Sequence, residues 1–144
     1  MYLGIDYGKK RIGLALGQLY PKGIGVIDNS LGKEVVLSNI SDIAKENDVQ
    51  AVVVGFPRRS QGEPGTLAEE IENFSKALAQ KAKLPIFFEE ERFTSTEAER
   101  IFKDSGKKPK LGQIDELAAV LILEQFLKRL KEDEGLIDKP DIHK

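Results

Sequence analysis

The sequence contains no cysteine and only one histidine, and these two absences remove several kinds of chemistry at once. Without cysteine there is no disulfide framework, no thiolate zinc site and no thiol nucleophile. The one histidine, His143, lies in a charged segment close to residue 144. A Ser-His-Asp or Cys-His mechanism therefore has no base inside the predicted domain. Carboxylates, lysines, arginines and tyrosines are left for catalysis, with or without metal ions.

Long hydrophobic runs are missing too. No stretch approaches the roughly 18 consecutive apolar residues that a membrane helix requires, and residues 1–6 lack the charged and apolar regions of a signal peptide. We therefore expect a cytoplasmic protein with no membrane partner. The 144 residues suit one globular domain, and a 40% hydrophobic content supplies a core beneath a surface rich in charge. The net charge of −2 neither indicates nor excludes a nucleic-acid partner.

Hydrophobic periodicity predicts an α/β protein. Three short apolar segments joined by turns favour an antiparallel meander, and two further buried strands alternate with helices. The expected strands are residues 3–6, 12–17, 23–27, 51–55 and 85–88; the expected helices lie between residues 32 and 47, from 66 to about 82, from 94 to about 106 and from 114 to about 130. The order βββαβαβαα predicts a mixed five-stranded sheet flanked by helices. We expect one domain, residues 1–130, followed by a charged tail with little order, residues 131–144.

Details of these segments carry further predictions. The small residues of segment 12–17 indicate close approach of another backbone. Thr66 and Glu69 have the spacing of a capping box at a helix start. Phe87 and Phe88 are predicted core residues, so no aromatic strand is expected to stack unpaired bases.

Acidic residues from three distant segments are predicted to meet at one sheet edge. Asp6 ends the first strand, and the run Glu89–Glu91 ends the last one. Ligand crevices of such sheets lie outside the carboxyl ends of the strands, and Asp115 falls in the first turn of the longest helix. Clustered carboxylates repel one another unless a cation lies between them, and oxygen ligands favour Mg²⁺ or Mn²⁺. Such a site supports hydrolysis with two metal ions.

Each of these residues also has a simpler interpretation. Asp6 precedes Tyr7-Gly8 and could be only a turn residue. The run Glu89–Glu91 could be a solvated strand end. Asp115 could serve only the helix dipole, a contribution of no more than about 1 kcal/mol. Their joint placement at one edge is what favours a metal site.

The basic residues fall into three groups, all in predicted loops: Lys9, Lys10 and Arg11; Arg58 and Arg59; and Lys107, Lys108 and Lys110. Two groups flank the proposed acidic segments, where they would neutralise the phosphates of a nucleic acid. Ordinary solubilising charge would explain the same placement.

Four segments together resemble the YqgF family, also called RuvX. Residues 4–15, Gly-Ile-Asp-Tyr-Gly-Lys-Lys-Arg-Ile-Gly-Leu-Ala, resemble its opening, and residues 54–57 followed by Gly62 are similar to its Val-Gly-Leu-Pro loop. Residues 90–95 resemble its Asp-Glu-Arg-Leu-Thr-Thr segment, with Glu90 and Phe93 in place of Asp and Leu. Residues 114–119 resemble its Asp-x-x-Ala-Ala helix start. The matches run in order from residue 3 to about 127.

The resemblance implies a ribonuclease H-like fold and a nuclease that binds Mg²⁺ or Mn²⁺, with two ions expected. It places Asp6, Glu91 and Asp115 at the catalytic and metal-binding positions, and Arg92 at a phosphate. Neighbours in a strand face opposite ways, so only one of Glu90 and Glu91 can face the metals. Glu91 is the choice because it matches the family residue by type.

The implied substrate is the 5′ end of precursor 16S ribosomal RNA, with the ribosome or pre-ribosomal particles as expected partners. The alternative is a four-way DNA junction. Paired cuts in a junction would favour a symmetric dimer, but the sequence shows no dimer interface, so a monomer or weak dimer is expected. A non-catalytic ribosome-assembly module is a third hypothesis. An ATPase of the actin and sugar-kinase type is disfavoured, because that architecture needs two such domains.

Overall fold

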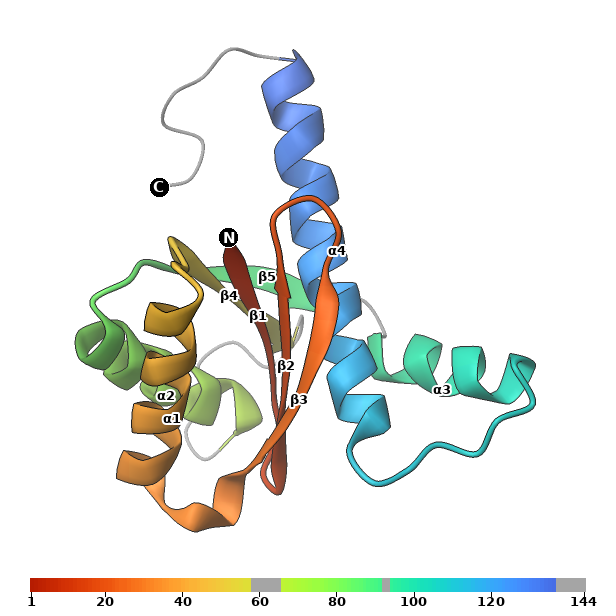
Figure 1. The fold of residues 1–144 in the computed structure, drawn as a ribbon, viewed down its shortest axis with the longest axis horizontal. Helices are drawn as coiled ribbons and strands as arrows, with labels where there is room; N and C mark the ends of the chain where they lie inside the picture. Colours follow the sequence, from red (N-terminus) through yellow and green to blue (C-terminus); the bar gives the residue numbers. More distant parts are fainter. Residues whose placement is uncertain (58–65, 92–93, 137–144) are drawn as a thin grey trace.

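The computed structural model describes residues 1–57, 66–91 and 94–136. Residues 58–65, 92–93 and 137–144, and the side chains of residues 91, 94, 95 and 134–136, lie outside the described part. One five-stranded sheet has the order β3-β2-β1-β4-β5 (Figure 1). Its strands are β1 (Tyr2–Tyr7), β2 (Arg11–Gly17), β3 (Lys22–Asp28), β4 (Ala51–Pro57) and β5 (Ile86–Glu91). The helices are η1 (Asn29–Leu31), α1 (Lys33–Glu46), α2 (Leu67–Ala82), α3 (Thr94–Asp104) and α4 (Gln113–Leu136).

The sheet is mixed, as the sequence predicted. β1 pairs antiparallel with β2, and β2 with β3, so the first three strands form the expected meander. β4 pairs parallel with β1, and β5 with β4. Three strands therefore deliver their carboxyl ends to the same edge, where ligand crevices of such sheets lie.

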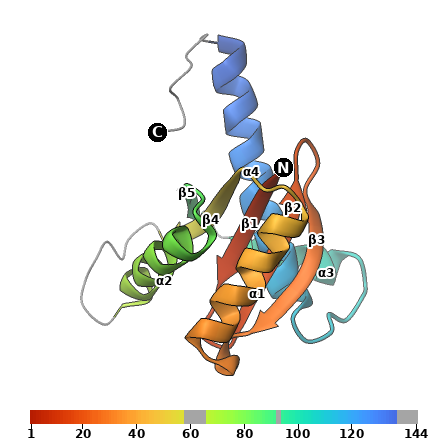
Figure 2. The ribbon, with the colours of Figure 1, turned by 60° about the vertical axis from the view of Figure 1, so that its left-hand side comes forward.

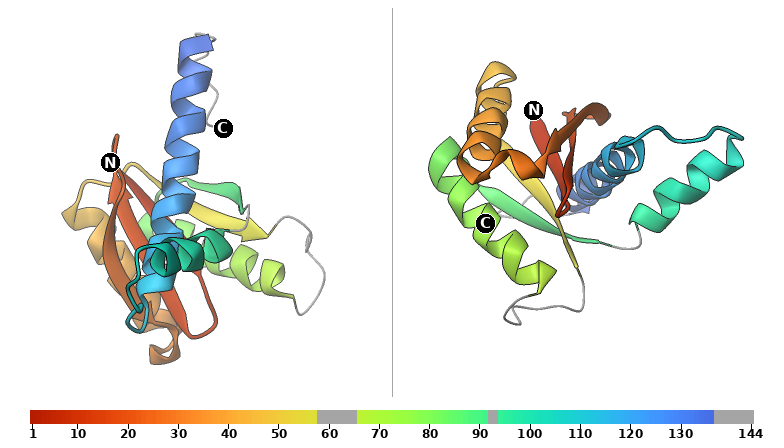
Figure 3. Two further views of the ribbon diagram at one scale, coloured as in Figure 1. Left: turned by 90° about the vertical axis from the view of Figure 1, so that its right-hand side faces the viewer. Right: turned by 90° about the horizontal axis from the view of Figure 1, so that it is seen from below.

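Helices cover both faces of the sheet. Helices α1 and α2 lie on one face, whereas α4 runs along the other and α3 stands away from the body beside it (Figures 2 and 3). Two apolar clusters match these layers. The larger one gathers residues such as Leu3, Ile5 and Ile40 on the α1–α2 side. The smaller one packs Val53 of β4 against Ile122 and Leu123 of α4.

The start of α2 confirms the expected cap. The Thr66 hydroxyl accepts a hydrogen bond from the Glu69 backbone N–H at 3.2 Å, which satisfies one of the amide groups that a helix start leaves without a partner. The position of α2 matters for the site, because its first turns carry Glu70 toward the β1–β2 turn.

Glycines in β1 and β2 let α4 come close to the backbone of the sheet. A Cβ atom added to Gly13 of β2 would stand 2.0 Å from the backbone oxygen of Asp115, and one added to Gly4 of β1 would stand 2.8 Å from Leu123 Cβ. The backbone of the first turn of α4 therefore touches the backbone of β2, as the small residues of this segment predicted.

Two predictions made from the sequence are wrong. Helix α4 continues to Leu136, although little order was expected from residue 131. Figure 1 shows this end of α4 projecting beyond the sheet. Lys131, Glu132 and Glu134 favour helix by intrinsic propensity, which accounts for the extension without packing on the sheet. Phe88 is 45% exposed instead of buried, because β5 is an edge strand; Phe87 is partly buried and stacks with Phe126.

Within the described residues, no helix combines the length and the apolar character needed to cross a membrane.

The Gly13 contact predicts a large effect from one methyl group. In Gly13→Ala the new Cβ meets backbone atoms that cannot rotate away, so we expect a loss of about 2 kcal/mol or more in the free energy of unfolding. Urea unfolding measures it. Gly23→Ala is the matched control, because its Cβ would meet only the movable side chain of Glu116. An equal loss in both variants would contradict a specific contact at Gly13.

Candidate nuclease site

Asp6 is positioned by the register of β1 and by the glycine opposite it. Asp6 pairs with Gly13, and antiparallel partners point to the same face of a sheet. The missing side chain of Gly13 points at the backbone of Asp115. The half-buried Asp6 side chain therefore lies on the α4 face, beside the first turn of α4. Two of the three predicted carboxylates come from adjacent parts of the structure.

Asp115 is paired with the arginine that begins β2. Arg11 Nε donates a hydrogen bond to Asp115 Oδ2 at 2.9 Å, and the two side chains are 32% and 25% exposed. Arg11 was predicted to contact phosphate, and the structure gives it this intramolecular partner as well. Partial exposure limits the contribution of such a pair to about 1 kcal/mol. Its larger consequence is orientation, because it fixes one carboxylate oxygen toward β2.

Glu89 is buried, so the simple interpretation of the whole acidic run as a solvated strand end is wrong for this residue. Its side chain is 5% exposed, and its carboxylate accepts hydrogen bonds from Gln125 Nε2 at 2.9 Å and from Arg129. Both donors belong to α4. Glu89 pairs in register with Gly55, whose missing side chain points at Ile122 of α4. The Glu89 phase of β5 therefore faces α4.

The phase of β5 bears on the choice between Glu90 and Glu91. Glu90 pairs with Phe56 and belongs to the opposite phase, while Gln125 also donates to its backbone oxygen at 3.0 Å. Glu91 pairs with Pro57 and has the same phase as Glu89, which is the phase that faces α4. This backbone position favours Glu91 as the residue on the face of Asp6. The side chain of Glu91 lies outside the described part, so its role stays a prediction.

The described side chains do not by themselves form a complete metal site. Among them, no three acidic or histidine groups converge closely enough to hold a metal ion. The predicted set includes Glu91, whose side chain is not described. The structure therefore brings Asp6 and Asp115 to one place, and the third ligand stays a prediction.

The lysines of the first and third basic groups are exposed to solvent. Lys9 and Lys10 in the β1–β2 turn are exposed, and so are Lys107, Lys108 and Lys110 between α3 and α4. A groove of about 430 Å³ beside the β1–β2 turn is lined by Lys9, Lys10 and Arg11, and by Leu111 at the end of the α3–α4 loop. Arg58, Arg59 and Arg92 lie outside the described residues.

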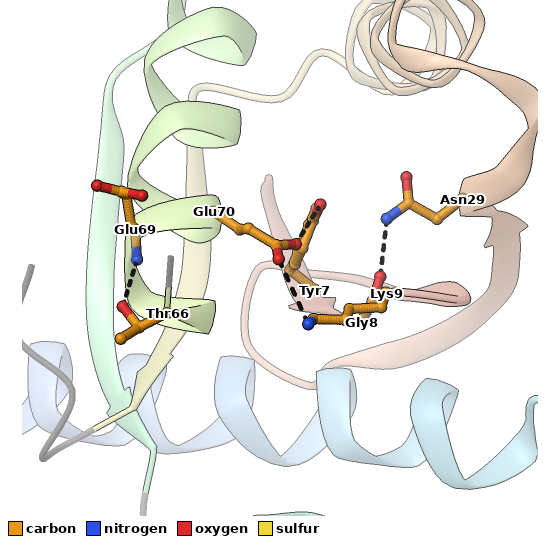
Figure 4. A network of polar contacts seen from close by, with 7 residues as sticks. All are labelled: Tyr7, Gly8, Lys9, Asn29, Thr66, Glu69 and Glu70. Carbon is orange, nitrogen blue, oxygen red and sulfur yellow. Dashed lines mark hydrogen bonds and ion pairs between the residues drawn. The ribbon is translucent and has the colours of Figure 1, made fainter. Parts of the chain in front are cut away.

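A polar network on the other face of the sheet holds the β1–β2 turn (Figure 4). Glu70 of α2 lies 3.6 Å from Lys9 Nζ and accepts a hydrogen bond of 3.5 Å from the Tyr7 hydroxyl. Asn29 Nδ2 donates to the backbone oxygen of Gly8 at 2.8 Å. The turn that carries Arg11 is thereby tied to α2 and to η1.

Sequence reasoning did not find Glu70, Asn29, Gln125 or Arg129. Each is a polar residue in a helix and forms its hydrogen bond with a residue 21 to 63 positions away in the sequence. A side chain that reaches so far along the chain leaves no local pattern. The only local signal was the acidic run Glu89–Glu91, and it did not show that Glu89 is the buried residue of the three.

Comparison with known proteins places the chain in a family. The model of the family described as "RuvX: Holliday junction resolvase" matches residues 1–129. The chain belongs to the RuvX family. A Synechococcus elongatus relative is 37% identical over 136 residues, covering 90% of both chains. A Ligilactobacillus salivarius relative is 33% identical over 141 residues, covering 90% of this chain and 96% of its own. Both bear the name "Putative pre-16S rRNA nuclease".

Solved structures agree on the fold of this RuvX member. RuvC of T. thermophilus in complex with a Holliday junction substrate superposes with a TM-score of 0.56 at 17% identity, covering 89% of this chain and 94% of that one. A second structure of Thermus thermophilus RuvC gives a TM-score of 0.53 at 15% identity. The predicted ribonuclease H-like fold class is confirmed.

The Glu89 contacts predict an unequal response of two neighbouring cations in α4. Arg129→Leu leaves a buried carboxylate with Gln125 as its remaining described donor, so we expect a loss on the order of 1–3 kcal/mol in the free energy of unfolding. Lys128→Leu, an exposed control that removes the same charge, should stay within about 0.5 kcal/mol.

Urea unfolding of the two variants, and of Arg129→Leu combined with Glu89→Gln, measures this difference. Removing the buried charge in the double variant should restore part of the loss. No recovery in the double variant would show that Arg129 stabilises the fold by packing alone.

Proposed function

We propose that this RuvX member is a nuclease that hydrolyses phosphodiester bonds with the help of divalent cations. The observation that carries the proposal is the juxtaposition at the carboxyl end of β1. There Asp6 faces the turn of α4 that holds Asp115, beside Arg11 and two lysine-bearing loops. Carboxylates that can hold a divalent cation, beside cationic side chains that can neutralise phosphates, suit hydrolysis of a phosphodiester bond.

The donor chemistry fits Mg²⁺ or Mn²⁺. Asp6 and Asp115 offer carboxylate oxygens only, and Glu91 would add a third from the α4-facing phase of β5. Hard cations prefer such ligands. When bound, they would lower the pKa of a water molecule and stabilise the charge that develops on the phosphate, and two ions are expected.

The other residues of the site would bind and orient the substrate. Lys9 and Lys10, which line the groove, and the exposed Lys107, Lys108 and Lys110 of the α3–α4 loop would neutralise phosphates of the substrate. Arg11 would hold Asp115 in one orientation during turnover. Arg58 and Arg92, expected at phosphates from the sequence, complete the cationic set of the proposal.

The first candidate substrate is the 5′ region of precursor 16S ribosomal RNA, supported by the names of the relatives. A cytoplasmic location and contact with pre-ribosomal particles would follow from it. The alternative is a four-way DNA junction, supported by the family description and by the fold shared with RuvC. Incubation with a labelled precursor leader, an unstructured RNA and a four-way DNA junction, with Mg²⁺ or Mn²⁺, compares the two.

The site predicts that removing the charge of Asp6 strongly reduces cleavage of the nucleic acid and leaves its binding unchanged. Asp6→Asn keeps the size of the side chain but removes the charge that would hold a cation. Several kcal/mol of phosphate stabilisation depend on that cation, so cleavage should fall about a hundredfold or more. Stability should hold or rise, because neighbouring carboxylates repel less. Single-turnover cleavage and thermal melts measure both.

Adjacent residues of β5 give a matched pair for the same experiment. Glu91→Gln should be as inactive as Asp6→Asn, while Glu90→Gln, which is in the opposite strand phase, should cleave like the wild type. Wild-type cleavage by pure Asp6→Asn would end the assignment. Loss of the cooperative melt in Asp6→Asn would instead mark Asp6 as a structural turn residue.

The exposed lysines of the α3–α4 loop predict a change in salt dependence. Replacing Lys107, Lys108 and Lys110 with alanine should weaken binding of every nucleic acid and reduce the slope of log affinity against log salt by about two to three units. Fluorescence anisotropy from 50 to 200 mM salt is the measurement. The control removes three exposed lysines on the other side of the protein, at positions 45, 76 and 81. Equal slopes in the two variants would identify the loop lysines as solvated surface.

A further inference from the structure

Leu111 is an apolar side chain held in solvent at the edge of the proposed nuclease site. It is 84% exposed, more than any other leucine whose side chain is described. Water contact of this extent is unfavourable for a leucine, and a single exposed apolar residue usually needs no explanation. Here the rigidity of its turn and the charges around it point to a ligand.

The turn that carries Leu111 is held by hydrogen bonds at both ends. The Lys110 N–H donates to Gln113 Oε1 at 2.7 Å, and the Gln113 N–H donates back to the Lys110 oxygen at 3.0 Å. Gly112 has a φ of +86°, a conformation that residues with a side chain adopt only with strain, and a Cβ added to it would stand 3.0 Å from the Val26 side chain of β3. Gly112 then accepts the first helical hydrogen bond of α4, from the Glu116 N–H. Leu111 is therefore fixed in position just before the turn that contains Asp115.

Leu111 forms one wall of a groove with an apolar floor and a cationic side. The floor is completed by Val26, which is 37% exposed. Lys9, Lys10 and Arg11 line the opposite side, and Arg11 is bonded to Asp115. Within the described part of the chain, no ion pair engages Lys10, Lys107, Lys108 or Lys110.

One carboxylate, Asp28, also lines this groove, but it is engaged locally. Its Oδ1 accepts hydrogen bonds from the Ser30 N–H at 2.9 Å and the Ser30 hydroxyl at 2.7 Å. These bonds hold the pKa of the Asp28 carboxyl below its ordinary value, so it is ionised at neutral pH and directed to Ser30. The lysines outnumber this one acid, and the groove suits a polyanion with an apolar face.

We propose that Leu111 packs against the face of an unstacked nucleobase next to the scissile phosphate. Lys9 and Lys10 on the opposite side of the groove would bind the flanking phosphates. Leu111 would hold open a base step, as apolar wedges do in other nucleic-acid complexes. The preferred substrate would then be a place where a duplex meets single-stranded nucleotides. A structured RNA precursor and a branched DNA share that feature. This inference rests on the proposed nuclease function and adds its substrate geometry.

Fluorescence of 2-aminopurine tests the proposal without cleavage, because its emission rises when the base unstacks. The probes are an RNA hairpin with a single-stranded 5′ leader and a DNA of the same shape, each with 2-aminopurine at the boundary, in EDTA. The wild type should raise the emission, and Leu111→Ser should lose most of the rise. Its affinity for the boundary probes should fall about tenfold, within the range for loss of one base contact. The affinity of Leu111→Ser for a fully paired duplex should differ little from that of the wild type.

Leu19→Ser is the control, because Leu19 is also strongly exposed, at 73%, and lies in the β2–β3 hairpin at the other end of the meander. It should behave as the wild type. The RNA and DNA arms show which polymer the groove takes. Cleavage assays with Mg²⁺ run in parallel. If there is no cleavage but the emission rise still depends on Leu111, the proposed nuclease function is contradicted and the role of Leu111 in binding an unstacked base is supported.

Two outcomes would overturn the proposal. One is no emission rise with the wild type, and the other is an unchanged emission rise in Leu111→Ser. If the second were accompanied by a change in sedimentation of Leu111→Ser, the groove would be assigned to contacts between copies of this chain. Thermal melts accompany each variant, and unfolding is not expected because the side chain is exposed.

Discussion

The direct contact between the backbone of α4 and the backbone of β2 is the constraint on which the rest of the site depends. Gly13 leaves no side chain between the two backbones, and a Cβ added to it would stand only 2.0 Å from the Asp115 backbone oxygen. The same glycine stands opposite Asp6 in the β1–β2 ladder. A single small residue thus sets both the depth at which α4 packs and the approach of two carboxylates. A larger residue would move the helix, the acid that it carries and the ion pair with Arg11 together.

The charges near this contact serve two distinct purposes. Glu70 and Glu89 are engaged in structure: the first ties the β1–β2 turn to α2, and the second joins β5 to α4. Arg11 stands between the two purposes, because it orients Asp115 and also lines the groove toward Leu111. The lysines of both loops remain exposed. Glu70, Glu89 and Asp115 are each paired with a cation, whereas the lysines of the α3–α4 loop have no ion pair within the described part of the chain.

The two faces of the sheet divide the work in a similar way. The α1–α2 face carries the larger apolar cluster and the network that fixes the β1–β2 turn. The α4 face carries the Asp6 position, the first turn of α4 and the groove. The contacts on the α1–α2 face therefore hold the β1–β2 turn in place, and this turn also lines the groove on the α4 face. The backbone of the turn that carries Leu111 is held by hydrogen bonds between Lys110 and Gln113.

The sequence by itself determined the order of the elements, the mixed sheet, the family and the grouping of basic residues in loops. These follow from hydrophobic periodicity, helix caps and short motifs, all of which act over a few residues. Only the tertiary structure decided that Glu89 is buried while Glu90 is exposed, that Arg11 binds Asp115, that Phe88 is exposed and that α4 runs to Leu136. The first two depend on contacts between residues 36 to 104 positions apart. The exposure of Phe88 depends on which strand lies at the edge of the sheet. Neither the partner of a side chain nor the place of a strand in its sheet is encoded in the residues beside it, because both are settled only when distant segments pack together.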